Sequence, residues 1–241
     1  MANKPWVSGP KELLDHGEGH LKSRTAFDCR IAIISIDNAV ELAIRTYLGL
    51  PVRARGTQGP SRKDLETATG FPDLLDLLEK YGGDRLSGVE LGDLEWYHRL
   101  RNTLYHDGNG VTVDPDKVDA YNQIARLLFN NLFEPSPNEV SEAPASTLLG
   151  ELVMKWATLE ARVDRLAREY LPRHARGIRT TVSLFDGLIA KSVVPSTLRR
   201  RVEELYRARN SVVHSPATTD TSQLKGLLAT IDDILAAIPG E

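Results

Sequence analysis

Two stretches of the chain repeat one pattern of chemically active side chains. Residues 95–106 read EWYHRLRNTLYH and residues 203–214 read EELYRARNSVVH, so they match without a gap at Glu, both Arg, Asn and His. A guanidinium can bind phosphate oxygens and stabilise charge on them, and histidine titrates near neutral pH and can move a proton. The pattern Arg-Asn-x-x-x-His therefore suits a phosphodiester substrate, and its members are Arg101, Asn102, His106, Arg209, Asn210 and His214.

The spacing predicts how these groups lie on a helix. Asn and His four residues apart share a face, and the Arg begins ~140° from the His but has a side chain long enough to swing back. One histidine could deprotonate a ribose 2′-hydroxyl while the other protonates the leaving 5′-oxygen. This chemistry needs no metal or other cofactor, and no carboxylate or Cys/His cluster in the sequence has the spacing of a metal site.

Long amphipathic helices are expected to carry the two motifs. Apolar residues recur at three- and four-residue steps from Cys29 to Tyr47 and again from Leu149 to Tyr170. Each opening helix is followed by a short apolar helix (71–82, then 182–191), a polar helix that ends in the motif, and a final amphipathic helix. The final helices begin near Asp114 and in the stretch TTDTSQ, where capping residues gather.

The chain is predicted to consist of two such units in tandem. Residues 133–146 (FEPSPNEVSEAPAS) are rich in Pro, Ser and Glu, which is typical of a linker. We expect a first helical unit over 1–135, a linker over 136–146 and a second unit over 147–241. The predicted class is all-α, with two four-helix up-and-down units that form a pseudo-twofold pair.

The motifs and the helical plan resemble the HEPN superfamily. Its ribonuclease members carry an Arg, usually a polar residue beside it, and a His four to six positions further on, near the end of the third helix of a four-helix unit; NAVELAIRTYLG (38–49) is similar to an opening helix of this kind. The resemblance implies a metal-independent endoribonuclease with one composite site built from both motifs. It also implies a toxin or an antiphage defence effector, with RNA as substrate, a regulatory protein or antitoxin as partner, and a homodimer as a compatible assembly.

Other residues bear on this hypothesis. Residues 1–145 carry a formal charge of −6 and residues 146–241 one of +3, so any polyanion must be bound by a local patch. The candidates for such a basic patch are RHARGIR (173–179) and RRR (199–201). A solvated loop and a solvated helix face explain these two stretches equally well. Arg99 and Arg207 also repeat; pairing with Glu95 and Glu203 on a solvated helix face explains them more simply than substrate contact.

An alternative function stays open. The same residues could satisfy the turn after each helix and pack between units, in a non-catalytic module that binds a nucleotide or a protein partner. The single cysteine, Cys29, lies in an apolar pattern and is expected to be a buried thiol. No apolar run has the ~20 residues of a membrane helix, and the amino-terminal residues lack the apolar core of a secretory signal. The sequence thus favours a cytoplasmic protein without a membrane partner.

Overall fold

A computed structural model describes residues 5–106, 112–133, 147–172, 180–214 and 220–240. Every regular element within these ranges is helical, which confirms the all-α class. The chain separates into two compact units, Met1–Ser141 and Glu142–Glu241, which we call unit 1 and unit 2. The expected linker, 136–146, lies outside the described residues.

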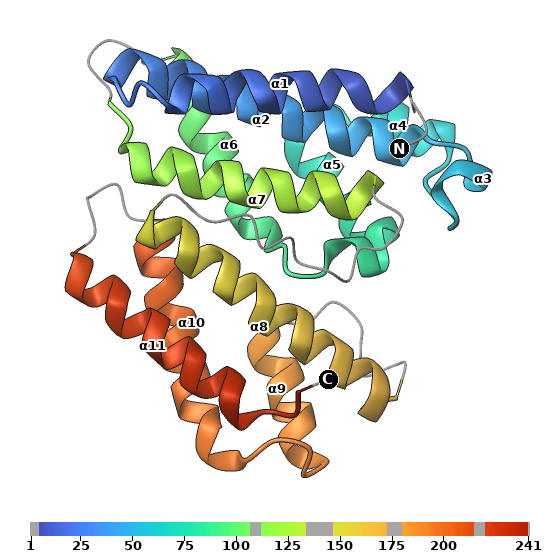
Figure 1. Cartoon of the computed structure of the whole chain (residues 1–241). Helices are drawn as coiled ribbons and strands as arrows, with labels where there is room; N and C mark the ends of the chain where they lie inside the picture. The colour runs from blue at the N-terminus through green and yellow to red at the C-terminus, as the bar shows by residue number, and fades with distance from the viewer. Residues whose placement is uncertain (1–4, 107–111, 134–146, 173–179, 215–219, 241) are drawn as a thin grey trace. The chain divides into compact units, whose positions relative to one another are not determined.

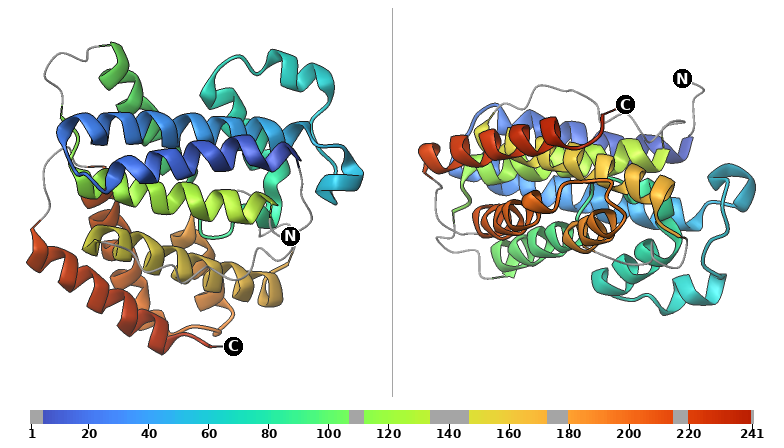
Figure 2. Two further views of the ribbon diagram at one scale, coloured as in Figure 1. Left: turned by 45° about the horizontal axis from the view of Figure 1, so that its top comes forward. Right: turned by 90° about the horizontal axis from the view of Figure 1, so that it is seen from below.

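Unit 1 is built on a ring of four helices to which a fifth long helix is added. Its helices are α1 (Pro5–Leu21), α2 (Ala26–Gly49), α3 (Val52–Arg55), α4 (Arg62–Thr67), α5 (Phe71–Gly82), α6 (Leu91–His106) and α7 (Pro115–Phe133), with the 3-10 helix η1 (Gly83–Leu86). Helix α2 contacts α5, α6 and α7, and α6 in turn contacts α5 and α7. Within unit 1, α1, α2 and α7 lie side by side, and α5 and α6 run across them (Figures 1 and 2).

Helix α1 was not predicted from the sequence. It packs along α2 and α7 and buries Leu14. Pro10 and Gly17 lie inside it, and both residue types ordinarily lower helix propensity, which hides the helical period. The glycine has a packing role, because a Cβ at position 17 would come within 2.7 Å of the Ile36 side chain. Close approach of α1 to α2 therefore compensates for the poor local propensity.

Unit 2 repeats the ring without the added helix. It consists of α8 (Leu148–Tyr170), α9 (Thr181–Ala190), the 3-10 helix η3 (Ser196–Leu198), α10 (Arg199–Val213) and α11 (Thr221–Ala237). Helix α8 contacts α9 and α11, and α10 contacts the same two helices. In unit 2, α8 and α11 form one layer and α9 and α10 lie behind it (Figure 1). The order of neighbours around this ring is that of α2, α5, α6 and α7.

The apolar stripes form the cores, as their periodicity predicts. The stripe of α2 from Cys29 to Tyr47 is buried, and so is that of α8 up to Leu166, whereas Tyr170 is 46% exposed at the helix end. Burial also raises the pKa of the Cys29 thiol. The expected caps are present as well, because Asp114 accepts from the backbone N–H of Asp116 at 2.9 Å and Asp220 accepts from that of Ser222 at 3.3 Å.

No helix in the described part of the chain combines the length and apolar character that crossing a membrane requires.

Candidate functional site

Both repeated motifs lie where a long helix ends. Helix α6 has His106 as its last residue, and His214 is the C-cap of α10, where its backbone N–H donates to the carbonyl of Asn210 at 2.9 Å. The imidazole of His214 is half-buried. The side chain of His106 and residues 107–111 lie outside what the structure describes. Each motif thus occupies the last turn of the helix that lies third in its ring.

In unit 1 the arginine of the motif bridges two helices. Nη1 of Arg101 donates to Oδ1 of Asn102 at 2.9 Å, and Nη2 donates to Oδ1 of Asn38 on α2 at 2.8 Å. Nε lies 3.5 Å from Oδ2 of Asp37, also on α2. The guanidinium therefore reaches the asparagine that precedes the histidine by four residues, as the sequence predicts, and it is anchored to α2 at the same time.

A buried carboxylate organises this half of the site. Asp37 is completely buried; its Oδ1 accepts from the hydroxyl of Tyr121 at 2.8 Å and its Oδ2 pairs with Nδ1 of His98 at 2.9 Å. A carboxylate can only accept, so Nδ1 of His98 carries a hydrogen. The His98 ring stacks on Phe71 with centroids 4.1 Å apart. Arg101 supplies the positive charge that makes burial of Asp37 tolerable.

The phenol of Tyr121 belongs to the same network. Burial raises its pKa well above the usual value, and the neighbouring Asp37 carboxylate adds to the effect. The hydroxyl therefore stays protonated and remains a donor to Asp37 at physiological pH. Its ring stacks on that of Tyr97, with centroids 4.3 Å apart, which fixes the direction in which the hydroxyl points.

In unit 2 the corresponding arginine lies in the core. Arg209 is 2% exposed, and its guanidinium lies over the indole of Trp156, 6.0 Å from the ring centroid. Its Nη1 donates to Oδ1 of Asn210 at 3.0 Å, which repeats the contact between Arg101 and Asn102. The Arg-Asn hydrogen bond is therefore common to both units. In addition, Arg101 lies beside the Asp37 carboxylate and Arg209 lies over the Trp156 ring.

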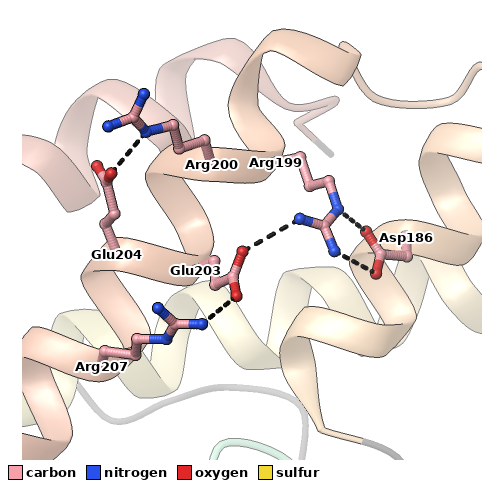
Figure 3. Close-up of polar contacts among 6 residues, drawn as sticks. All are labelled: Asp186, Arg199, Arg200, Glu203, Glu204 and Arg207. Carbon is pink, nitrogen blue, oxygen red and sulfur yellow. Dashed lines mark hydrogen bonds and ion pairs between the residues drawn. The ribbon is translucent and has the colours of Figure 1, made fainter.

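The other repeated arginines lie on a solvated helix face. Arg99 is 3.9 Å from Glu95, and Arg207 is 2.5 Å from Glu203, so both predicted pairs are present. Figure 3 shows the pair on α10 within a chain of opposite charges that extends to α9. These contacts hold the outer arginines among carboxylates, and solvent screening keeps their contribution to stability small.

The candidate basic patch RRR (199–201) is largely neutralised by the same network. Arg199 pairs with Asp186 at 2.9 Å and Arg200 with Glu204 at 2.7 Å, while Arg201 pairs with an acidic residue of α11. Figure 3 shows the first two pairs. This arrangement agrees with the interpretation of a solvated helix face. The other candidate, 173–179, lies outside the described residues.

Sequence reasoning missed the surroundings of the motif arginines. Asp37, Asn38 and Trp156 contact these arginines, and His98 and Tyr121 contact Asp37. One signal was available. Asp37 lies among Ile33, Ile36 and Val40 on the apolar stripe of α2, where a carboxylate requires a buried partner. The identity of that partner depends on which helices become neighbours, and periodicity does not carry that information.

Within the described ranges, no three His, Cys, Asp or Glu side chains gather as a metal site would require. Comparison with protein-family models, with curated proteins and with solved structures finds no match to this chain. The two motifs and their surroundings in each unit are therefore the features that bear on function.

Proposed function

We propose that this protein is a metal-independent endoribonuclease of the HEPN type. In the proposed reaction one motif histidine removes the proton from a ribose 2′-hydroxyl, and the oxygen attacks the adjacent phosphorus. The bond from phosphorus to the 5′-oxygen breaks, and the other histidine protonates that oxygen. The products are a 2′,3′-cyclic phosphate and a free 5′-hydroxyl. His106 and His214 supply the acid and the base, and the motif arginines and asparagines stabilise charge and orientation.

The observation that carries this proposal is the recurrence of the motif in three respects. The residues repeat without a gap, each copy occupies the end of the corresponding helix, and the Arg-Asn hydrogen bond recurs at 2.9 and 3.0 Å. Many residue types can form the last turn of a helix, so the recurrence of Arg, Asn and His together favours a shared chemical role. A role as a toxin or antiphage effector, acting with a regulatory partner, belongs to the same proposal.

The surroundings of Arg101 support a phosphate contact in unit 1. A guanidinium has five N–H groups. One N–H at each of Nη1 and Nη2 is used by an asparagine, and Nε faces Asp37. The side chain is 21% exposed, so further N–H groups could reach a substrate oxygen. The anchoring contacts would hold them in place beforehand, which lowers the entropy cost of binding.

The rival is a non-catalytic helical module, and the burial of Arg209 favours it. A side chain only 2% exposed and packed over Trp156 stabilises the core of unit 2 and offers little surface to a substrate. In this alternative the motifs fix the end of each helix, and the protein binds a nucleotide or a protein partner without cutting RNA.

A cleavage assay with matched histidine variants distinguishes the ribonuclease from the non-catalytic module. Purified wild type, His106→Ala, His214→Ala and the control His16→Ala are incubated with total cellular RNA in EDTA, and the cut ends are sequenced. His16 is exposed on α1 and belongs to neither motif. We expect wild type and His16→Ala to leave 2′,3′-cyclic phosphates and each motif variant to lose about 100-fold or more in rate.

Three results would exclude the proposed mechanism. They are retention of full activity by both motif variants, arrest of cleavage by EDTA, and equal cutting of a substrate with 2′-deoxyribose at the cleaved position. Circular dichroism of each variant verifies that the helical fold is retained.

A further inference from the structure

Tyr105 has an unusual position for an aromatic side chain. It directly precedes His106 in the last turn of α6 and is 64% exposed, the highest fraction among the large apolar side chains in the described ranges. Exposing an aromatic ring forgoes the gain of burying it, and isolated exposed apolar residues are common. Tyr105, however, lies inside the motif, between Asn102 and His106, so its exposure bears on the function of the motif.

The ring is held next to the arginine of the motif. The guanidinium carbon of Arg101 lies 5.4 Å from the centroid of the Tyr105 ring, within the range of a cation–π contact. Arg101 is itself anchored by Asp37 and Asn38 on α2. The tyrosine therefore presents an exposed aromatic ring beside a cation whose position the fold determines. A flat, exposed ring beside a guanidinium is the combination that binds an unpaired base and its phosphate.

The second motif lacks this feature. Val213 occupies the matching position in the gap-free alignment and is fully buried. At the end of α10, packing is therefore satisfied by a small apolar residue directed into the core. Packing does not explain why the matching position in unit 1 holds a large exposed aromatic residue. Arg209 is also buried, whereas the Arg101 side chain is 21% exposed. Arg101 and Tyr105 in unit 1 are therefore more accessible than the corresponding residues Arg209 and Val213 in unit 2.

We infer that Tyr105 is the platform on which a nucleobase of single-stranded RNA stacks, next to the phosphate that Arg101 binds. This inference rests on the proposed ribonuclease function and assigns the two motifs unequal roles. Unit 1 supplies the direct base and phosphate contacts through Tyr105 and Arg101, while Arg209 acts from the core of unit 2 by orienting Asn210. The base must be unpaired, because a base within a duplex is already stacked on both faces. Stacking tolerates every base, so Tyr105 selects single strands rather than a sequence.

Binding and cleavage are measured separately to test this inference. The probe is a fluorescent 12-nucleotide single-stranded RNA with 2′-O-methyl groups, which supplies no attacking hydroxyl, and its unmodified form reports cleavage. The variants are Tyr105→Phe, Tyr105→Trp, Tyr105→Leu and Tyr105→Ala. Phe27→Ala is the matched control, because Phe27 is 60% exposed on α2 of the same unit. Phe and Trp should retain binding, whereas Leu and Ala should weaken it about tenfold or more.

An abasic nucleotide, moved one position at a time along the probe, locates the stacked base. At that position the abasic change and Tyr105→Ala should be no worse together than either alone, because both remove one contact. Wild-type binding by Tyr105→Ala and Tyr105→Leu would overturn the inference while leaving the ribonuclease intact, provided that wild type cleaves. If wild type neither binds nor cleaves the RNA, the proposed function fails, and this inference fails with it.

Discussion

Oδ2 of Asp37 lies 3.5 Å from Nε of Arg101, and this aspartate is completely shielded from solvent. The contact joins α2 to α6, the helix that carries the motif. It places a permanent cation beside a buried anion that also accepts hydrogen bonds from Tyr121 and His98. The orientation of Arg101 is thus coupled to the stability of the α2–α6 contact.

Asp37→Asn should destabilise the protein strongly. The amide keeps the size of the side chain but removes the charge that balances Arg101, and its NH2 group cannot accept a hydrogen bond. We expect a loss of about 3 kcal/mol in the free energy of unfolding, as for other broken buried pairs. Urea denaturation followed by circular dichroism measures it. Asp15→Asn is the control, because Asp15 forms an exposed ion pair with Arg126 and should cost about 1 kcal/mol or less. Equal losses would refute the structural role of Asp37.

Arg209→Lys should also be destabilising, in spite of the retained charge. An ammonium lacks the planar surface that lies over Trp156 and the Nη1 group that donates to Asn210, and it is more strongly hydrated than a guanidinium. We expect a loss of about 2 kcal/mol and a red shift of tryptophan emission. Arg207→Lys, on the exposed face of the same helix, should change neither quantity measurably. Guanidinium chloride denaturation followed by tryptophan fluorescence measures the stability of both variants and of wild type.

Lys117 should give stability a distinct pH dependence. It is buried in the first turn of α7, and burial lowers its pKa to about 8 from 10.5, against the opposing effect of Asp114 and Asp116. Between about pH 8 and 10.5 the unfolded chain keeps a proton that the folded protein has lost. Unfolding then takes up a proton, so this group makes stability rise with pH in that interval.

Comparing wild type with Lys117→Met separates the effect of Lys117 on stability from that of other groups that titrate in the same pH interval. The stability of wild type relative to Lys117→Met should rise between pH 8 and 10, because only wild type loses the buried charge. Lys63→Met, which changes an exposed lysine, should follow wild type throughout. Thermal or urea unfolding at half-unit pH steps gives the curves. Parallel curves for wild type and Lys117→Met would show that burial does not depress this pKa.

The two motif histidines should behave as one catalytic unit if acid and base act on the same phosphodiester. His106→Ala and His214→Ala should then each cost about 100-fold or more, and the double variant should be scarcely slower. Mixing the single variants should restore nothing if both groups come from one chain. Rates for each single variant near half of wild type would instead mean two separate sites. Initial rates on one defined RNA decide between these outcomes.

The sequence by itself determined the helices, their buried stripes, two of their caps and the place of both motifs at helix ends. Each of these depends on residues within a few positions of one another, where a period of 3.6 residues and capping preferences act directly. Helix α1 and the short helices α3 and α4 were exceptions. In α1, Pro10 and Gly17 obscure the helical period, and its stability comes from packing against α2.

Only the tertiary structure decided what the motif side chains contact. Arg101 and Arg209 occupy the same place in one repeated sequence, yet one rests on Asp37 and the other on Trp156. Their partners lie on α2 and α8, far away in the chain, and the sequence around each arginine does not encode them. Local sequence predicts which groups share a helix face; the packing of helices determines which of those faces are buried and which remain open to a substrate.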